Sequence, residues 1–213
     1  MRNNNAEDTA KEIFNNDEHV SNYEMKTKKA NWLGPEIMLG LAFRHINGGE
    51  KILDLGIGSG LCSELFHKAG LIIFGMDFSK KMLDMCQRKK FAADLKKYDL
   101  RETPYPYADD SMDHAVCGGV MHILSDIDPI FNEVSRITRS GGIFTFCSMD
   151  MDRQKTMSVK TTAGNAVVFG HGIKEIELLL EKHCFKLINS ISFEIDNHDL
   201  LRHFTAYAVR NIK

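Results

Sequence analysis

The sequence is short of the features that mark several specialised classes of protein. It contains one tryptophan and four prolines in 213 residues, and no apolar run approaches the roughly 18 residues of a membrane-spanning helix. Lys plus Arg number 27 and Asp plus Glu 29, so the net charge of −2 gives no indication of binding to nucleic acid or to an anionic membrane. The five cysteines lie at least 24 residues apart and never form the close pairs of a zinc or redox site: Cys62, Cys86, Cys117, Cys147 and Cys184.

The composition that is present is that of an ordinary globular protein. Hydrophobic residues make up 43% and charged residues 26% of the chain, which excludes a disordered, collagen-like or disulfide-scaffold protein. At about 100–200 residues per domain, the length predicts a single domain. Dispersed cysteines are normally reduced thiols of a cytoplasmic protein, and no apolar segment follows the basic residue at the start. We therefore expect a soluble, cytoplasmic protein.

The chain divides into a polar beginning and one regular domain. Residues 1–30 carry few large apolar side chains and are expected to form an arm or lid, with residues 31–213 as the globular domain. Pro35 and the apolar residues behind it predict a helix over 34–46. Apolar runs then alternate with amphipathic segments, as in a parallel sheet with crossover helices. Strands are expected at 51–55, 71–76, 94–98, 114–117 and 143–148, then a loop or hairpin at 150–170, a helix from 173, and an antiparallel pair at 185–195 and 205–209.

The strongest chemical signal is the glycine-rich run DLGIGSG, residues 54–60, placed where the first strand turns into a helix. Glycines at such a turn let a ligand approach the backbone. Asp77 comes 23 residues after Asp54, at the end of the next strand, where a carboxylate can bind both hydroxyls of a ribose. The loop and the acid together predict a nucleoside ligand.

Spacing and charge distinguish between the nucleoside cofactors that share this kind of fold. A pyrophosphate-binding loop needs a small residue three places after its second glycine, and Leu61 stands there. The carboxylate of Asp54 would also repel a pyrophosphate, whereas it suits a cationic group such as the ammonium of S-adenosylmethionine. A nicotinamide-dependent reductase is therefore disfavoured.

At this point the chain resembles the class I S-adenosylmethionine-dependent methyltransferases, in particular the type 11 methyltransferase domain family. The resemblance covers about residues 20–150 and rests on four ordered motifs: ILDLGIGSG, GMDFSKKML, PYPYADDSMDHAV and EVSRITRSGGIF. It implies an α/β, Rossmann-like, seven-stranded and mostly parallel sheet in the order 3-2-1-4-5-7-6, with strand 7 antiparallel and helices on both faces. It also implies S-adenosylmethionine as cofactor and S-adenosylhomocysteine as product, without a metal.

The resemblance assigns roles to particular residues. Gly56 and Gly58 would lie under the methionine part of the cofactor, Asp77 would hold the ribose, and Phe78 would pack on the adenine. The acid that contacts the adenine would be Asp99, with the Leu100 amide, and Asp94 is the alternative. Tyr23 and Trp32 would cover the cofactor, although Trp32 could equally anchor the first helix in the core. The implied cofactor-binding residues are Tyr23, Trp32, Asp54, Gly56, Gly58, Gly60, Asp77, Phe78, Met82, Asp99, Leu100, Cys117 and Gly118.

Methyl transfer from a sulfonium is an in-line displacement that needs mainly a well-placed acceptor, so a catalytic residue is not strictly required. A base matters only when the acceptor keeps its proton at neutral pH, and His122, after the fourth strand, is the candidate. The alternative is a histidine with a satisfied structural hydrogen bond.

The acceptor is expected to be a small molecule. The segment CGGV at 117–120 is unlike the N/D-P-P-Y/F motif of enzymes that methylate DNA bases or glutamine, and the paired lysines are too dispersed to indicate a nucleic-acid surface. A catalytically silent module that only binds the cofactor or a partner is the alternative, because a cofactor site does not prove turnover. The sequence leaves the oligomeric state open.

Overall fold

The computed structural model describes residues 4–150, 156–161, 164–196 and 201–213. The helices are α1 (Asn4–Phe14), α2 (Asp17–Lys29), α3 (Gly34–Ala42), α4 (Leu61–Lys68), α5 (Lys80–Arg88), α6 (Asp128–Ile137) and α7 (Ile173–Lys182), with short 3₁₀ turns η1 (Phe43–His45) and η2 (Met121–Ile123). The strands are β1 (Lys51–Leu55), β2 (Ile72–Asp77), β3 (Ala92–Lys97), β4 (His114–Cys117), β5 (Ile143–Met149), β6 (Thr156–Thr161), β7 (Gly164–Phe169), β8 (Phe185–Asp196) and β9 (Leu201–Asn211).

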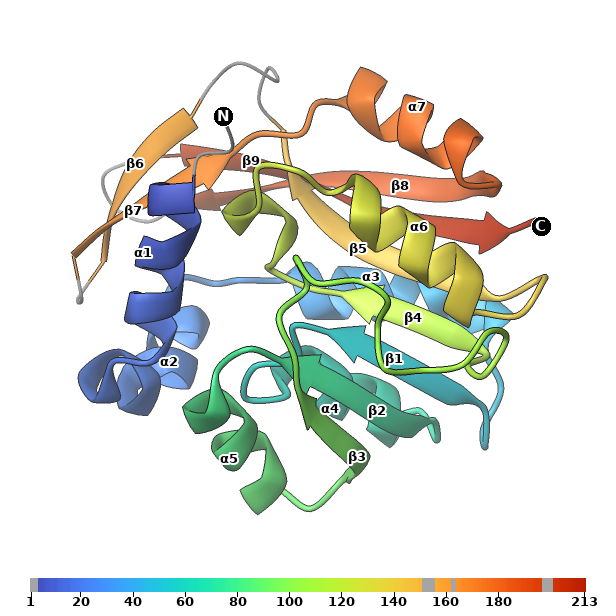
Figure 1. Ribbon diagram of the computed structural model, residues 1–213, viewed down its shortest axis with the longest axis horizontal. Helices are drawn as coiled ribbons and strands as arrows, with labels where there is room; N and C mark the ends of the chain where they lie inside the picture. The colour runs from blue at the N-terminus through green and yellow to red at the C-terminus, as the bar shows by residue number, and fades with distance from the viewer. Residues whose placement is uncertain (1–3, 151–155, 162–163, 197–200) are drawn as a thin grey trace.

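Seven strands form one sheet in the order β3-β2-β1-β4-β5-β9-β8 (Figure 1). The first five are parallel, and β9 runs antiparallel to both β5 and β8. This is the predicted order, with β8 and β9 as the sixth and seventh strands of the sheet, so the fold prediction is confirmed. The order reverses between β1 and β4, and in open α/β sheets ligands bind at such a switch point, beyond the carboxyl ends of the strands.

The segment between β5 and α7 forms a hairpin of its own. Strands β6 and β7 pair antiparallel, from Thr156 opposite Phe169 to Thr161 opposite Gly164, in a separate two-stranded sheet. The hairpin alternative predicted for 150–170 is thus the one observed. The residues that join β8 to β9, 197–200, lie outside the described ranges.

The N-terminal arm is helical. Helix α1 packs against α2 and against β7 of the hairpin, and α2 packs against α5 (Figure 1). Asn16 caps α2 by accepting a hydrogen bond from the backbone N–H of His19 at 3.0 Å. Ala10, Ile13 and Val20 are the described hydrophobic side chains of these helices that become buried. The arm therefore has a small apolar contact with the rest of the chain.

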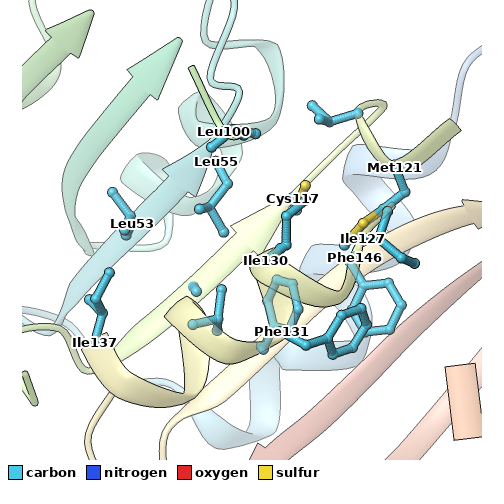
Figure 2. Close-up of a cluster of buried hydrophobic side chains, with 14 of the residues drawn as sticks. Leu53, Leu55, Leu100, Cys117, Met121, Ile127, Ile130, Phe131, Ile137 and Phe146 are labelled. Atoms are coloured by element: carbon cyan, nitrogen blue, oxygen red, sulfur yellow. The ribbon is translucent and has the colours of Figure 1, made fainter. Parts of the chain in front are cut away.

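Apolar side chains on both faces of the sheet form the core. Figure 2 shows the face covered by α6, where the rings of Phe131 and Phe146 meet edge to face with centroids 5.2 Å apart. Burying one such side chain contributes about 1.5–3 kcal/mol. On the other face, Met38 of α3 and Phe66 of α4 are fully buried. All residues of β5 are buried, so the strand is covered on both faces, which is typical of a central strand.

The remaining global expectations can be compared with the structure directly. All five cysteines are free thiols, and four of them are buried. Among the described residues, no helix is long and apolar enough to cross a membrane.

Candidate functional site

The glycine loop after β1 is fixed to the end of β2. The backbone N–H groups of Gly56 and Ile57 both donate to the carbonyl of Met76, at 2.8 and 3.0 Å. Gly56 and Gly58 have φ values of 75° and 55°, a left-handed conformation that favours glycine. A Cβ on Gly56 would collide with the side chain of Val120, which follows β4. The glycines therefore let β1, β2 and the β4 loop converge at one point.

Asp77 lies at that point, at the end of β2. Its Oδ2 accepts a hydrogen bond from the backbone N–H of Gly58 at 2.9 Å, and its Oδ1 accepts one from the backbone N–H of Ser79 at 2.8 Å. Burial raises the pKa of Asp77 to about 6, although the two backbone hydrogen bonds oppose the shift. Each carboxylate oxygen can accept a further bond, so the geometry suits a pair of vicinal hydroxyl groups.

Asp54 is a second buried carboxylate, on β1. Its Oδ2 accepts a hydrogen bond from the hydroxyl of Ser63 at 2.6 Å. Burial raises the pKa of Asp54 to about 7 against the effect of that hydrogen bond, and the nearby charge of Asp77 adds to the rise. Among the described residues, neither acid forms an ion pair, and no group of three His, Cys, Asp or Glu side chains could hold a metal. A cationic ligand would supply the missing positive charge.

Two adjoining cavities open beside these acids. The larger encloses about 570 Å³, part of it open to solvent, and is lined by Phe14, Tyr23, Gly56, Gly58, Asp77, Phe78, Met82, Asp99, Leu100, Gly118, Gly119, Val120, Ile123 and Leu124. The smaller encloses about 370 Å³ and is lined by Tyr23, Trp32, Pro35, Asp54, Gly56, Ile57, Gly58, Ser59, Leu61, Cys62 and Gly118. Eleven of the thirteen cofactor-binding residues expected from the sequence line one or both cavities.

The two that line neither cavity have other surroundings. A Cβ on Gly60 would lie 2.6 Å from the ring of Phe91 and 2.9 Å from the sulfur of Cys86, so this glycine lets α4 pack closely against neighbouring elements. The side chain of Cys117 is fully buried in the core, and burial raises the pKa of its thiol. Asp94, the alternative adenine contact, lies on β3 and outside both cavities.

Trp32 lies both at a cavity and in an apolar cluster. Its side chain lines the smaller cavity. Its ring also packs against Phe204, with centroids 5.0 Å apart, and against Phe193, with centroids 5.6 Å apart. The same side chain thus forms a wall of the cavity and joins the arm to β8 and β9.

Asp99 and Leu100 follow β3 and line the larger cavity. Asp99 forms ion pairs with Arg101 at 2.9 Å and with Lys11 of α1 at 2.6 Å. Although burial raises the pKa of Asp99, the hydrogen bonds from Arg101 and Lys11 hold it well below its usual range. The hydroxyl of Tyr105 donates to the Leu100 carbonyl at 2.9 Å, which fixes the backbone at this end of the cavity.

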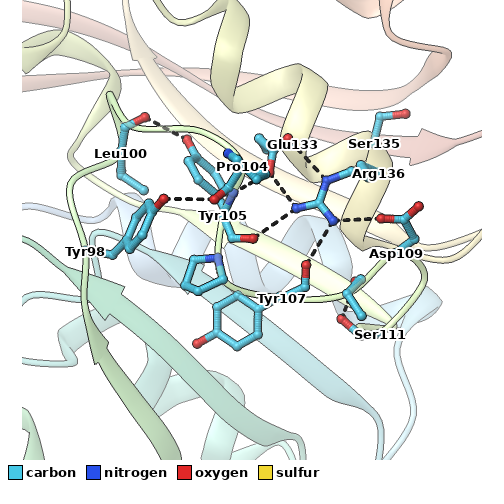
Figure 3. Close-up of polar contacts among 12 residues, drawn as sticks. Tyr98, Leu100, Pro104, Tyr105, Tyr107, Asp109, Ser111, Glu133, Ser135 and Arg136 are labelled. Carbon is cyan, nitrogen blue, oxygen red and sulfur yellow. Dashed lines mark hydrogen bonds and ion pairs between the residues drawn. The ribbon is translucent and has the colours of Figure 1, made fainter.

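A buried ion pair supports the loop that carries Tyr105 (Figure 3). The guanidinium of Arg136 donates to Glu133 at 2.6 Å and to the backbone carbonyls of Tyr105 and Tyr107 at 3.1 and 2.9 Å. Glu133 also accepts from the backbone N–H of Tyr105 at 2.6 Å. Helix α6 therefore holds the loop in the shape that places Leu100.

Phe14 is a site residue that the sequence reasoning did not identify. Its ring lines the larger cavity, with centroids 6.2 Å from Phe78 and 6.1 Å from Tyr23. Its carbonyl accepts a hydrogen bond from the hydroxyl of Ser79 at 2.6 Å, which attaches the end of α1 to the segment that carries Asp77. Only the apolar pair at 13–14 in a polar arm could have suggested it.

The segment after β4 also contributes cavity residues that the sequence analysis did not name, because only its histidine was considered there. Val120, Ile123 and Leu124 line the larger cavity. His171, a buried residue after β7, has its Nε2 3.1 Å from the Met121 carbonyl and 2.9 Å from the Leu124 carbonyl. The apolar letters VMHIL at 120–124 were the available signal, whereas the contribution of His171 depends on a contact across 47 residues or more.

His122 lies in η2, on the side of this segment toward β9. Its ring packs edge to face on Phe204, with centroids 5.6 Å apart, and its Nδ1 is buried without a hydrogen-bond partner in the described structure. Burial lowers the pKa of His122 to about 4, and the positive charges of Arg202 and His171 add to the effect. His122 lines neither of the two cavities described above.

Comparison with known proteins agrees with this geometry. Residues 53–146 match the family model described as a methyltransferase domain. A malonyl-[acyl-carrier protein] O-methyltransferase from Serratia marcescens is 30% identical over 114 residues, which are 54% of this chain and 43% of the relative. A demethylmenaquinone methyltransferase from Renibacterium salmoninarum is 31% identical over 94 residues, 44% of this chain and 39% of the relative. The chain thus spans less than half the length of these two relatives.

A solved S-adenosylmethionine-dependent methyltransferase from Methanosarcina mazei superimposes with a TM-score of 0.70, covering 81% of this chain and 97% of that one at 14% identity. At this identity the superposition shows the shared fold. The sheet order and the match over residues 53–146 make the chain similar to the class I S-adenosylmethionine-dependent methyltransferases. S-adenosylmethionine is the cofactor of that family.

Proposed function

We propose that this protein transfers a methyl group from S-adenosylmethionine to a small-molecule acceptor. The observation that carries the proposal is the pair of buried carboxylates, Asp54 and Asp77, at the glycine loop without a cation of the described chain beside them. Unpaired buried acids are unfavourable unless a ligand compensates them. A cationic nucleoside satisfies both, with its charge near Asp54 and its ribose hydroxyls on Asp77.

The other residues of the site fit the remaining parts of that ligand. Phe78 and Phe14 offer aromatic surface for an adenine, and the Leu100 backbone and Asp99 offer polar contacts at its edge. The hydroxyl of Ser59 is buried, lines the smaller cavity and has no partner in the described structure, so it is free to bind the amino-acid end. When bound, S-adenosylmethionine supplies an electrophilic methyl group on a sulfonium.

The residues around the methyl position would act by placing the acceptor and by excluding water. Gly118 and Gly119 keep the backbone after β4 open to the cavity, since Gly118 lines both cavities and Gly119 lines the larger one. The low pKa of His122 keeps its ring neutral at pH 7, and a neutral imidazole has a lone pair that can take a proton from a hydroxyl acceptor. His122 lines neither cavity, so it is proposed as a base only for an acceptor that extends beyond them to reach its ring.

Charge distribution supports a small acceptor over a nucleic acid. Two of the dispersed lysines are paired with acids of the arm: Lys81 with Asp17 at 2.6 Å, and Lys89 with Glu24 at 2.7 Å. Ion pairs of this kind reduce the positive charge that is available to a phosphate backbone. The relatives named above methylate a carrier-bound malonyl group or a quinone precursor by name, which is consistent with an acceptor other than a nucleic acid.

Calorimetric titration with S-adenosylmethionine and S-adenosylhomocysteine tests the proposal without knowledge of the acceptor. We expect micromolar binding of both and none of NAD or NADP. A screen of metabolites for release of S-adenosylhomocysteine then tests turnover. Binding without turnover of any acceptor would favour a silent cofactor-binding module, and absence of binding would refute the cofactor assignment.

A further inference from the structure

An apolar cluster lies next to the cofactor cavities, where β5 and β8 end and β9 begins. Its buried members are Met149, Val168, Ile195 and Phe204, and Trp32 and Phe193 pack against them. Phe193 and Phe204 stack with ring centroids 5.9 Å apart, and Trp32 meets Phe204 edge to face. Because Trp32 also lines the smaller cofactor cavity, this aromatic wall is continuous with the proposed methyl-transfer site.

Two nitrogen groups with no hydrogen-bond partner in the described structure lie at this wall. They are Nε of Arg202 and Nδ1 of His122, and both atoms are buried. Arg202 stands opposite Ile195 in the β8–β9 ladder and two residues before Phe204, so its side chain shares their face of the sheet. His122 approaches the same Phe204 ring from the β4 side, with centroids 5.6 Å apart. Both groups thus lie on the side of the sheet that carries the Phe204 ring.

The electrostatics of Arg202 differ from those of Arg136, a partly buried arginine described above. Arg136, by comparison, is paired with Glu133 and Asp109. For Arg202 no described carboxylate lies within ion-pair distance, and burial lowers the pKa of its guanidinium with no acid to raise it again. The charge of Arg202 is strong enough at His122 to help lower the pKa of that ring. A half-buried guanidinium without a counter-ion is unfavourable until an anion binds.

We propose that Arg202 and His122 form an anion-binding subsite for the methyl acceptor, which is a carboxylate with an apolar or aromatic body. This inference rests on the proposed function, because the acceptor must reach the same site as the cofactor. The planar guanidinium can bind a carboxylate through two parallel hydrogen bonds. The wall of Trp32, Phe193 and Phe204 then receives the apolar body, and the neutral ring of His122 supplies one more polar contact.

Benzoate and benzamide form a matched pair of probes, because they have nearly the same shape and differ in charge. The full-length protein, saturated with S-adenosylhomocysteine, is titrated with each, and the Nε–H resonance of Arg202 is followed by NMR. We expect benzoate to shift this resonance and to bind about tenfold or more tightly than benzamide. Equal binding of the two, or no response to benzoate at millimolar concentration, would overturn the proposal.

Variants separate the subsite from the fold. Arg202→Met keeps an apolar stem and should abolish the preference for benzoate, whereas Arg202→Lys should retain part of it, because the charge stays and the paired hydrogen bonds are lost. Arg210→Met, on the same strand β9 beside His45, is the matched control and should bind benzoate as the natural protein does. If Arg202→Met is folded and still prefers benzoate, the assignment is wrong.

Binding of S-adenosylhomocysteine is measured separately on every variant and should be unchanged. Failure of that binding in the natural protein would refute the proposed function. The benzoate titration, repeated on the ligand-free protein, would still decide whether Arg202 binds an anion.

Discussion

The backbone N–H of Gly58 donates a hydrogen bond to Oδ2 of Asp77 over 2.9 Å, so the loop after β1 and the end of β2 position each other. The second oxygen of the same carboxylate is held by the N–H of Ser79, which begins α5. The carboxylate is therefore oriented before any ligand arrives. Such preorganisation reduces the entropic penalty of binding.

Replacing Asp77 by alanine should weaken S-adenosylmethionine binding by on the order of 1–3 kcal/mol, because charge-assisted hydrogen bonds to the ribose hydroxyls are lost. Titration calorimetry measures the change. Asp84→Ala removes a partly exposed acid from the neighbouring α5 and serves as the control. Unchanged affinity in a folded Asp77→Ala protein would contradict the ribose assignment.

Gly58→Val should block the cofactor while leaving the sheet in place. The residue has a φ of 55°, which a β-branched side chain adopts only with strain, and its Cβ would come within 3.2 Å of Met82 at the cavity wall. Gly40→Ala is a useful contrast, because its Cβ meets nothing within 4 Å and lies in α3. That change should stabilise the fold by up to about 1 kcal/mol and leave binding intact. Normal cofactor binding by Gly58→Val would argue against the loop assignment.

Cofactor affinity should rise with pH between about pH 5 and about pH 8. Burial raises the pKa of Asp54 to about 7 and that of Asp77 to about 6, so the ligand-free site holds protons in this range. A cationic ligand favours the ionised acids, so binding releases those protons and is weakened at low pH. Titrations in buffers of different ionisation enthalpy count the protons. Adenosine has a ribose and no positive charge, so its affinity should depend on the ionisation of Asp77 alone. The affinity for adenosine should therefore reach its plateau at a lower pH than the affinity for S-adenosylmethionine. A flat or opposite pH profile for S-adenosylmethionine would contradict the charge argument.

Arg136→Met should lower the free energy of unfolding by about 1–3 kcal/mol, because it leaves the buried carboxylate of Glu133 without its partner. Thermal unfolding should report this as a fall of Tm by about 2–4 °C for each kcal/mol. Cofactor affinity should fall as well, since the loop that places Leu100 is released. Arg44→Met changes an exposed arginine and should alter neither quantity. A lower free energy of unfolding with unchanged cofactor affinity would show that the loop held by Arg136 does not contribute to cofactor binding.

The positions of the strands were predictable from the sequence because apolar runs repeat along the chain, whereas the order of the strands in the sheet followed from the resemblance to the methyltransferase family. Apolar runs, the glycine loop and Asp77 mark the carboxyl ends of β1 and β2 without any knowledge of distant contacts. The choice between Asp94 and Asp99 was not decidable in this way. It depends on where β3 ends, and the residues AADLKK of this strand show no clear alternation of buried and exposed positions.

Contacts between distant residues account for what the sequence did not show. Lys11 and Asp99 are 88 positions apart, and no local pattern pairs them. The close approach of Gly60 to Phe91 and Cys86 could not be foreseen either, because these two residues come much later in the chain. Likewise, the isolation of Arg202 emerges only when β8, β9 and η2 are assembled around it.

Among the described residues, β6 and β7 pair with each other and with no strand of the main sheet, although β7 packs against α1. The sequence and length of this hairpin can therefore change without shifting the register of any strand in the main sheet. This separation makes the hairpin a replaceable cassette for protein engineering. Chimaeras that carry hairpins of other lengths should keep the glycine loop, Asp77 and the seven-stranded framework in place.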